Sequence, residues 1–253
     1  MKKALTGPDI RELVLNWQHL VGCRLDQFGR PDEHKLVLKL RSSKTGTVRI
    51  VIDFGGWLYL TKEQISTESN KRVFVNSVRK AIKKGRLNSI TQLNGDRILC
   101  MEFIRGEQSY SLIFELFHKG NAILCHEGRI STVMRKQKFR HRSLSSGIDY
   151  KPPIGFNPFE SEYSDFEKTL LTSERPLGAS LTINCNLGGE ISNLVCHKLE
   201  IEGKDSVEKS QIHDIYNQVQ EIISDKIKPT IFLDEEGSII TVSALSLTNL
   251  KIG

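Results

Sequence analysis

Residues 90–103, ITQLNGDRILCMEF, decide how the first half of the chain folds and raise the first question about its function. Asn94-Gly95 is typical of a tight turn between antiparallel strands, because both residues tolerate positive φ. The apolar run after the turn predicts a strand. Asp96 and Arg97 stand between the two, and two interpretations stay open. They are polar residues of an ordinary hairpin, or they are a recognition pair held at a strand edge.

Alternating apolar residues predict strands on both sides of this turn. The strands are expected at 34–42, 47–54, 56–61, 97–104, 110–117 and 121–129, with a tight turn at 118–121. Two helices interrupt them. The first is capped by Thr6, has Pro8 and Asp9 in its first turn and ends at Gly22. The second covers 70–85 and has a basic outer face. Strands interrupted by two helices predict an α+β sandwich or curled sheet, and not an alternating βαβ fold.

The composition changes within DYKPPIGFNPFESEYSDFEK, residues 149–168, where three prolines stop regular structure. We therefore predict two domains, 1–155 and 156–253. Helices are expected in the second domain at 162–173, 190–203 and 207–227. A closing hairpin is expected over 229–247, with its turn at 234–237.

The charge of the chain is divided between these two parts. The whole chain has a net charge of +6. Residues 1–155 hold 28 Lys and Arg against 14 Asp and Glu, whereas residues 156–253 hold 8 against 16. The basic first part is a candidate for binding a polyanion, because neutralisation of phosphates supplies most non-specific affinity for nucleic acids.

Two basic clusters are candidates for contacts to an RNA backbone. The first is Arg79, Lys80, Lys83 and Lys84, and the second is Arg135, Lys136, Lys138, Arg140 and Arg142. A solvated helix face is the simpler interpretation of the first cluster. The second cluster lies in a stretch with little apolar periodicity, which favours a segment that contacts phosphates.

Gly188-Gly189 leads directly into a predicted helix, and an apolar residue precedes it. This is the layout of a helix-hairpin-helix, in which glycine lets the backbone approach a phosphate while helix N–H groups point at it. A Gly-Gly turn between helices is also common without any ligand. Both interpretations stay open, and the acidic surroundings favour the second.

Several other classes of protein are disfavoured. Mean hydropathy is −0.29, and no run of about 18 apolar residues predicts a membrane span. The first residues, MKKALTGPDIRELV, lack the apolar segment of a secretory signal. The five cysteines and seven histidines show no disulfide framework and no metal-ligand spacing. We expect a cytoplasmic protein with no metal, cofactor, small-molecule substrate or catalytic residue, because no motif for nucleophilic or nucleotide chemistry occurs.

Several stretches together resemble the NFACT family, the group that includes ribosome-associated quality-control factors and bacterial proteins once called fibronectin-binding. They are 5–28, 75–103, 113–130 and 141–153, with LGGEI at 187–191. The most specific parts are DIR at 9–11, the DR pair at 96–97 and EL..KGN.IL at 115–124. The resemblance covers nearly the whole chain. It implies an N-terminal domain similar to that of the formamidopyrimidine-DNA glycosylases, followed by a mainly helical helix-hairpin-helix domain.

The resemblance also implies a function. Family members bind a large ribosomal subunit obstructed by a peptidyl-tRNA, engage tRNA and in many cases direct C-terminal tailing of the stalled chain. The family's functional acidic residue falls on Asp9, and its Asp-Arg pair falls on Asp96 and Arg97. A guanidinium that bonds a phosphate or base edge, oriented by a carboxylate, suits tRNA recognition.

Two alternatives follow from the same resemblance. A surface adhesin would fit the older family name, but the sequence predicts no secretion signal. A nucleic-acid-processing enzyme would fit the glycosylase likeness, but Lys2-Lys3 stand where those enzymes carry their nucleophilic proline. Full-length members continue into a coiled coil and a further ribosome-contacting domain. We therefore expect this chain to hold the tRNA-facing half, and we do not expect tailing from it alone.

Overall fold

The computed structural model describes residues 4–65, 73–224, 230–233 and 239–243. Its contacts divide the chain into two compact units. We call the described residues among 13–93 and 97–153 the sheet unit, and those among 1–12, 94–96 and 154–253 the helical unit. The assignment of sequence domains to 1–155 and 156–253 stays a prediction.

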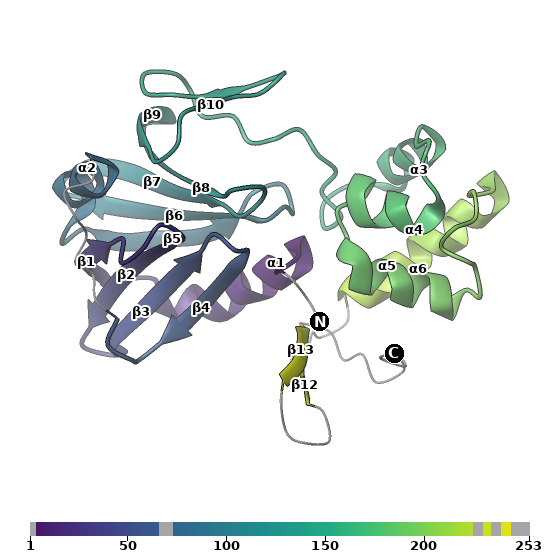
Figure 1. The fold of residues 1–253 in the computed structure, drawn as a ribbon, viewed down its shortest axis with the longest axis horizontal. Helices are drawn as coiled ribbons and strands as arrows, with labels where there is room; N and C mark the ends of the chain where they lie inside the picture. Colours follow the sequence, from purple (N-terminus) through teal and green to yellow (C-terminus); the bar gives the residue numbers. More distant parts are fainter. Residues whose placement is uncertain (1–3, 66–72, 225–229, 234–238, 244–253) are drawn as a thin grey trace. The chain divides into compact units, whose positions relative to one another are not determined.

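One antiparallel sheet dominates the sheet unit (Figure 1). Its order is β4-β3-β2-β1-β5-β6-β7-β8-β9. The strands are β1 Arg24–Gly29, β2 Lys35–Ser42, β3 Gly46–Asp53, β4 Trp57–Thr61, β5 Arg86–Gln92, β6 Ile98–Arg105, β7 Gln108–Glu115, β8 Asn121–His126 and β9 Arg129–Val133. A small separate pair, β10 Gln137–Lys138 and β11 Ser143–Leu144, follows. The predicted α+β class is confirmed, and where a β-sandwich-like domain or curled sheet was expected the structure has one large antiparallel sheet with flanking helices.

The sequence prediction missed strands β1 and β5, which lie at the centre of the sheet. In both strands the register shifts, between Leu25 and Gln27 in β1 and between Leu87 and Ser89 in β5. Such a bulge adds a residue and breaks the alternation of apolar and polar side chains on which a strand prediction depends.

Strands β6–β8 are covered on both faces. Ile98, Ile113 and Ile123 lie on one face, where they form a buried cluster with Leu144. Their neighbours Leu112, Phe114 and Leu124 must point to the opposite face, because side chains alternate along a strand, and they are buried as well. Helix α2, Val73–Ile82, contributes to the sheet unit through its buried residues Phe74, Val75, Val78 and Ile82.

The turn within residues 90–103 has the predicted form. It joins β5 to β6, and Asn94 and Gly95 have φ of 54° and 61°. The Leu93 N–H donates a hydrogen bond to the Ile98 carbonyl, 3.1 Å, which closes the turn. Residues 94–96 pack within the helical unit. The hairpin interpretation of Asn94-Gly95 is therefore confirmed, and the role of Asp96 and Arg97 stays open.

The helical unit begins with α1, Gly7–Asn16, whose second half continues into the sheet unit and a 3-10 turn, η1 Trp17–Leu20. Gly22 ends this helical stretch with φ of 91°, as predicted. The other helices are α3 Tyr163–Leu171, α4 Leu177–Ala179, η2 Ser180–Asn184, α5 Gly188–Lys198, η3 Lys209–Gln211 and α6 Ile212–Ser224. Phe166, Leu181, Val195, Ile215 and Val219 are among the residues of their buried core.

Strands β12 Thr230–Leu233 and β13 Ile239–Ser243 pair antiparallel, which agrees with the expected closing hairpin. The turn predicted at 234–237 lies outside the described residues. In the part of the chain that the structure describes, no helix is long and apolar enough to cross a membrane.

Candidate functional site

The first predicted recognition residue, Asp9, caps helix α1. One carboxylate oxygen of Asp9 accepts hydrogen bonds from the backbone N–H and the hydroxyl of Thr6, both 2.6 Å. The Asp9 N–H points back to the Thr6 hydroxyl at 3.5 Å. This is the reciprocal arrangement of a capping box. Asp9 is only 5% exposed, and these contacts with Thr6 stabilise the start of the helix.

Three backbone segments of the helical unit meet at the start of α1. A Cβ on Gly7 would collide with the carbonyl oxygen of Gly95, and the Asn186 side-chain amide donates a hydrogen bond to the same oxygen, 3.1 Å. A Cβ on Gly95 would lie 2.5 Å from the Asn157 side-chain oxygen. Close approach of backbone requires glycine here. We call Gly7, Gly95, Asn186 and Gly188 the glycine junction.

The two glycines of the predicted phosphate-binding turn differ in their surroundings. Gly188 has φ of 78°, and a Cβ there would lie 2.6 Å from the Thr6 side-chain methyl carbon. Gly189 has no atom within 4 Å of such a Cβ. The requirement for Gly188 is therefore explained by backbone conformation and by packing on Thr6. The open space at Gly189 leaves room for the approach of another chain.

Asp96 and Arg97 follow directly on the glycine junction in the chain. Asp96 belongs to the helical unit and Arg97 to the sheet unit, and both side chains are half-buried. The carbonyl of Arg97 accepts a hydrogen bond from the Leu116 N–H, 2.9 Å, which fixes the chain where β6 begins. The backbone of the predicted recognition pair is therefore held on both sides.

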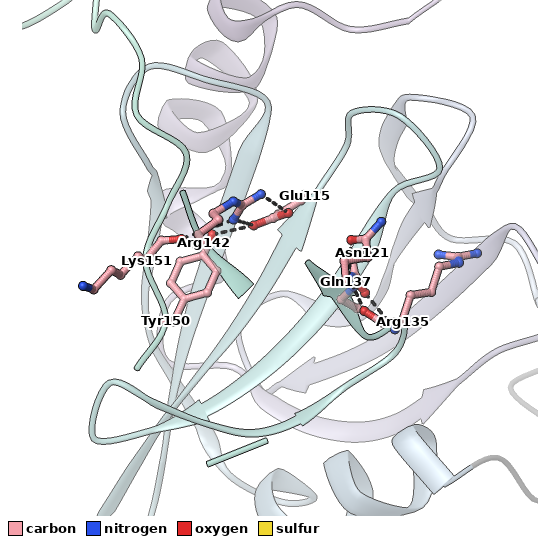
Figure 2. A network of polar contacts seen from close by, with 8 residues as sticks. Glu115, Asn121, Arg135, Gln137, Arg142, Tyr150 and Lys151 are labelled. Atoms are coloured by element: carbon pink, nitrogen blue, oxygen red, sulfur yellow. Dashed lines mark hydrogen bonds and ion pairs between the residues drawn. The ribbon is translucent and has the colours of Figure 1, made fainter. Parts of the chain in front are cut away.

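The second basic cluster belongs to a segment that is anchored to the sheet. Arg142 donates two hydrogen bonds to the carboxylate of Glu115, 2.5 and 2.9 Å, and the Tyr150 hydroxyl donates a third, 2.9 Å. Figure 2 shows the Arg142 guanidinium and the Tyr150 side chain converging on this carboxylate. Burial lowers the pKa of Arg142, but the hydrogen bonds and charge of Glu115 outweigh this effect and raise its pKa above the ordinary value. Arg142 is therefore a buried cation.

Asn121 holds the beginning of the same segment. Its side-chain amide donates to the Arg135 carbonyl, 2.8 Å, and to the Gln137 side-chain oxygen, 2.9 Å. Its side-chain oxygen accepts from the Arg135 N–H, 3.0 Å (Figure 2). Asn121 and Glu115 are direct partners across the β7–β8 hairpin, and both are 1% exposed. We call residues 135–151 the strap, because this pair of buried polar residues fastens both of its ends.

The strap contributes side chains to a hydrophobic core, which its weak apolar periodicity did not indicate. Leu144 is fully buried, and Phe139 and Tyr150 pack against the same apolar cluster. The Arg142 guanidinium lies 4.8 Å from the centre of the Phe139 ring. Burial also lowers the pKa of Arg135, which donates to the Gly120 carbonyl, 2.8 Å. Of the five predicted cations, Lys136, Lys138 and Arg140 are exposed.

The cluster on α2 is divided in a similar way. Arg79 is half-buried and donates from Nε to the Phe28 carbonyl, 2.7 Å. Lys80, Lys83 and Lys84 are exposed. Lys84 lies two residues after the end of α2 and has φ of 66°, and its N–H donates to the Leu25 carbonyl, 2.8 Å. Each cluster therefore contributes three exposed cations and at least one arginine that stabilises the fold.

Glu115 and Asn121 were not among the predicted site residues. The signal was present, because both lie within the EL..KGN.IL stretch at 115–124. Their partners lie 14 to 35 residues further along the chain, so sequence spacing could not identify them. Among the described residues, no group of three His, Cys, Asp or Glu side chains could hold a metal ion.

Comparison with known proteins identifies the family. A family model described as the NFACT N-terminal and middle domains matches residues 6–252. The chain belongs to the NFACT family. This NFACT chain is 27% identical over 253 residues to "Archaeal Rqc2 homolog aRqcH" of Methanocaldococcus jannaschii, a match that covers 93% of this chain and 38% of that protein. It is 27% identical over 222 residues to "Ribosome quality control complex subunit 2" of Saccharomyces cerevisiae, covering 84% of this chain and 21% of that protein.

Solved structures agree with this NFACT fold. The N-terminal part of the fibronectin/fibrinogen-binding protein from Streptococcus suis superposes with a TM-score of 0.74 at 20% identity, covering 96% of this chain and 90% of that chain. The fibrinogen binding protein from Staphylococcus aureus gives a TM-score of 0.70 at 18% identity, covering 95% and 91%. At this level of identity the likeness establishes the fold. The chain spans 38% and 21% of the length of the two curated relatives named above, and the second of these is named as a subunit of a ribosome quality control complex.

Proposed function

We propose that this chain is the RNA-binding part of a ribosome quality-control factor. It binds tRNA on a large ribosomal subunit obstructed by peptidyl-tRNA, in the cytoplasm, and supports C-terminal tailing by the whole protein. The observation that carries the proposal is the family match over residues 6–252 together with relatives named as ribosome quality-control proteins. The proposal describes a binding factor and assigns no bond-making step to this chain.

The electrostatics of the sheet unit support RNA as the partner. Six predicted cations are exposed there: Lys80, Lys83, Lys84, Lys136, Lys138 and Arg140. Three of them project from the strap, whose position is fixed by Glu115 and Asn121. Side chains on a fixed backbone bind phosphates with a smaller loss of conformational entropy than side chains on a free loop. We leave Arg135 and Arg142 out of the contacting set, because their guanidinium groups are engaged inside the protein.

Selectivity is assigned to Asp96 and Arg97, with Asp9 in a supporting role. The two residues are neighbours in the sequence and both are half-buried. A guanidinium can bond a base edge or a phosphate with two parallel hydrogen bonds, and a carboxylate can accept from a base amine. Asp9 supports this pair indirectly, because it caps the start of α1. Gly7, in the first turn of α1, packs against the carbonyl of Gly95, the residue before Asp96. The helix-hairpin-helix interpretation assigns the RNA-backbone approach to Gly189, where space is open.

Equilibrium binding to bulk tRNA and to duplex DNA of equal length tests this proposal. The variant Lys136→Gln/Lys138→Gln/Arg140→Gln should weaken tRNA binding and lower the slope of log Kd against log salt by about two to three, because each phosphate contact contributes about one ion. The matched control replaces Arg41, Lys44 and Lys62 by Gln, which removes the same charge from exposed positions of the sheet unit outside the strap. Equal losses in the two triple variants would contradict a phosphate-contacting strap.

A further inference from the structure

A cavity of about 480 Å³ lies in the sheet unit between helix α2 and the strands of the sheet. Its lining includes Ser77 and Lys80 of α2, Arg105 at the end of β6, Tyr110 of β7, and Ser131 and Thr132 of β9. We call this cavity the α2 pocket. Its volume falls in the range of about 300–1,000 Å³ that is typical of small-ligand sites.

The aromatic wall of the α2 pocket is held in place. Tyr110 and His126 are direct partners on neighbouring strands, and their rings stack with centroids 4.7 Å apart. The Tyr110 hydroxyl donates a hydrogen bond to the Gln108 side-chain oxygen, 2.6 Å. Two contacts therefore fix the orientation of the ring. An aromatic ring of fixed orientation, next to the buried Leu124, offers a surface on which a nucleic-acid base packs.

The charge of the α2 pocket is positive. Among its described lining residues the charged side chains are Lys80 and Arg105. Arg105 donates hydrogen bonds from Nη1 to the Lys80 carbonyl and to the Ala81 carbonyl, the latter 3.1 Å. These carbonyls belong to the last turn of α2, where the partial negative charge of the helix would repel an anion. Arg105 offsets that charge, so Lys80 remains available to a phosphate.

We propose that the α2 pocket binds one nucleoside phosphate, with the base against Tyr110 and Leu124 and the phosphate beside Lys80 and Arg105. Hydroxyl groups of Ser77, Ser131 and Thr132 line the remaining wall and match the hydroxyls of a ribose. An unpaired nucleotide of an RNA chain supplies this chemistry, and so does a free nucleotide. The RNA source rests on the proposed function. An RNA ligand is also consistent with the exposed cations Lys83 and Lys84, which follow Lys80 along the chain and could contact neighbouring phosphates.

Single-residue variants separate this pocket from general charge. The test uses the full 253-residue chain and a fluorescent five-nucleotide RNA. Lys80→Gln should raise the Kd for this RNA about tenfold, while Lys44→Gln, which changes an exposed lysine outside the pocket lining and outside both basic clusters, should raise it no more than about twofold. Ser131→Trp fills the pocket from an exposed position without changing charge, and should also raise the Kd about tenfold. Thermal melting of each variant checks that it folds.

Adenosine monophosphate identifies the source of the ligand. Saturable binding of this nucleotide that Ser131→Trp abolishes would support the pocket with a free nucleotide as its ligand. Binding of the five-nucleotide RNA alone, with the same sensitivity, would support the pocket with RNA as its source. If Ser131→Trp changes neither Kd, and if Lys80→Gln and Lys44→Gln are equivalent, the pocket inference is overturned.

The same series distinguishes failure of this inference from failure of the proposed function. Binding of wild-type protein to tRNA and to duplex DNA is measured alongside. Preference for tRNA with no response to Ser131→Trp overturns the pocket inference alone. Equal binding to tRNA and DNA, with nucleotide binding that Ser131→Trp abolishes, contradicts the proposed function and supports the pocket.

Discussion

The guanidinium of Arg142 makes two parallel hydrogen bonds to the carboxylate of Glu115, 27 residues earlier in the chain. The side chains are 8% and 1% exposed. A bidentate pair of this kind is strong and directional, and leaving one partner alone in a buried site is costly. The pair therefore determines where the strap lies, and with it the position of Lys136, Lys138 and Arg140.

Removing one partner of this pair should destabilise the protein severely. We expect Arg142→Met to lower the free energy of unfolding by about 3–5 kcal/mol, because it leaves the Glu115 charge buried and unpaired. Urea unfolding measures the loss. The control Arg140→Met, at an exposed position of the same strap, should change it by less than about 0.5 kcal/mol. Similar losses in both variants would mean that the buried pair does not stabilise the strap.

Tyr150 should make stability decrease at alkaline pH. Burial, followed by the charge and hydrogen bond of Glu115, raises the pKa of Tyr150 above its ordinary value. The unfolded chain loses this proton near pH 10 and the folded chain keeps it. The contribution of Tyr150 to the free energy of unfolding is therefore fully present below about pH 10. Above that pH it decreases by up to about 1.4 kcal/mol per pH unit.

The variant Tyr150→Phe isolates this effect. It should unfold with a smaller pH slope than the wild type between pH 10 and 11, measured by urea midpoints. The wild type and Tyr150→Phe must be compared because a second group also makes stability decrease with rising pH. Burial raises the pKa of Cys125 to about 12, which gives a pH slope of the same sign in both proteins. Identical slopes would show that Tyr150 ionises normally in the folded protein.

The two neighbouring glycines should respond oppositely to alanine. Gly188→Ala should lower the free energy of unfolding by about 1–3 kcal/mol, because φ of 78° and the Thr6 methyl both oppose a Cβ. Gly189→Ala should raise it by about 0.5–1 kcal/mol, because the residue is helical with open space. Thermal melting compares them. If Gly189 approaches an RNA backbone, Gly189→Ala also weakens tRNA binding; unchanged binding would remove this glycine from the interface.

The cap of α1 provides a further test. Thr6→Ala and Asp9→Ala should each lower the free energy of unfolding by about 1 kcal/mol, because each removes the same capping box. The double variant should lose less than the sum of the two. Additive losses, measured by urea unfolding, would indicate that Asp9 stabilises the protein by another contact.

Much of the sheet could be predicted from local pattern, and its centre could not. The alternation in β2, β3 and β6–β8 and the Asn94-Gly95 turn are local signals. Strands β1 and β5 were not predicted because their bulges break the alternation of apolar and polar residues. Their place in the sheet also depends on pairing between residues that are distant in the sequence. The pairing of Arg24 with Arg86 across these two strands, for example, is not indicated by any local sequence pattern.

The predicted site residues stay predictions, but the structure separates those that are exposed from those that are engaged inside the protein. Residue types and family resemblance pointed to Asp9, Asp96, Arg97 and two basic clusters. They could not separate Arg142, which is buried against Glu115, from the exposed Arg140 two positions earlier. That distinction depends on a partner across the fold. The α2 pocket is likewise lined by residues of α2 and by strand residues up to 55 positions away in the sequence, so no local sequence pattern predicts it.

The most direct test of the central claim, selective RNA recognition by Asp96 and Arg97, is the affinity of Asp96→Ala/Arg97→Ala for tRNA and for duplex DNA across a salt series. We predict that wild-type protein prefers tRNA at high salt and that the double variant loses this preference, while its affinity at low salt decreases only modestly. Thermal melting confirms that the variant is folded. An unchanged preference for tRNA in the folded double variant would contradict the account and return Asp96-Arg97 to the role of hairpin residues.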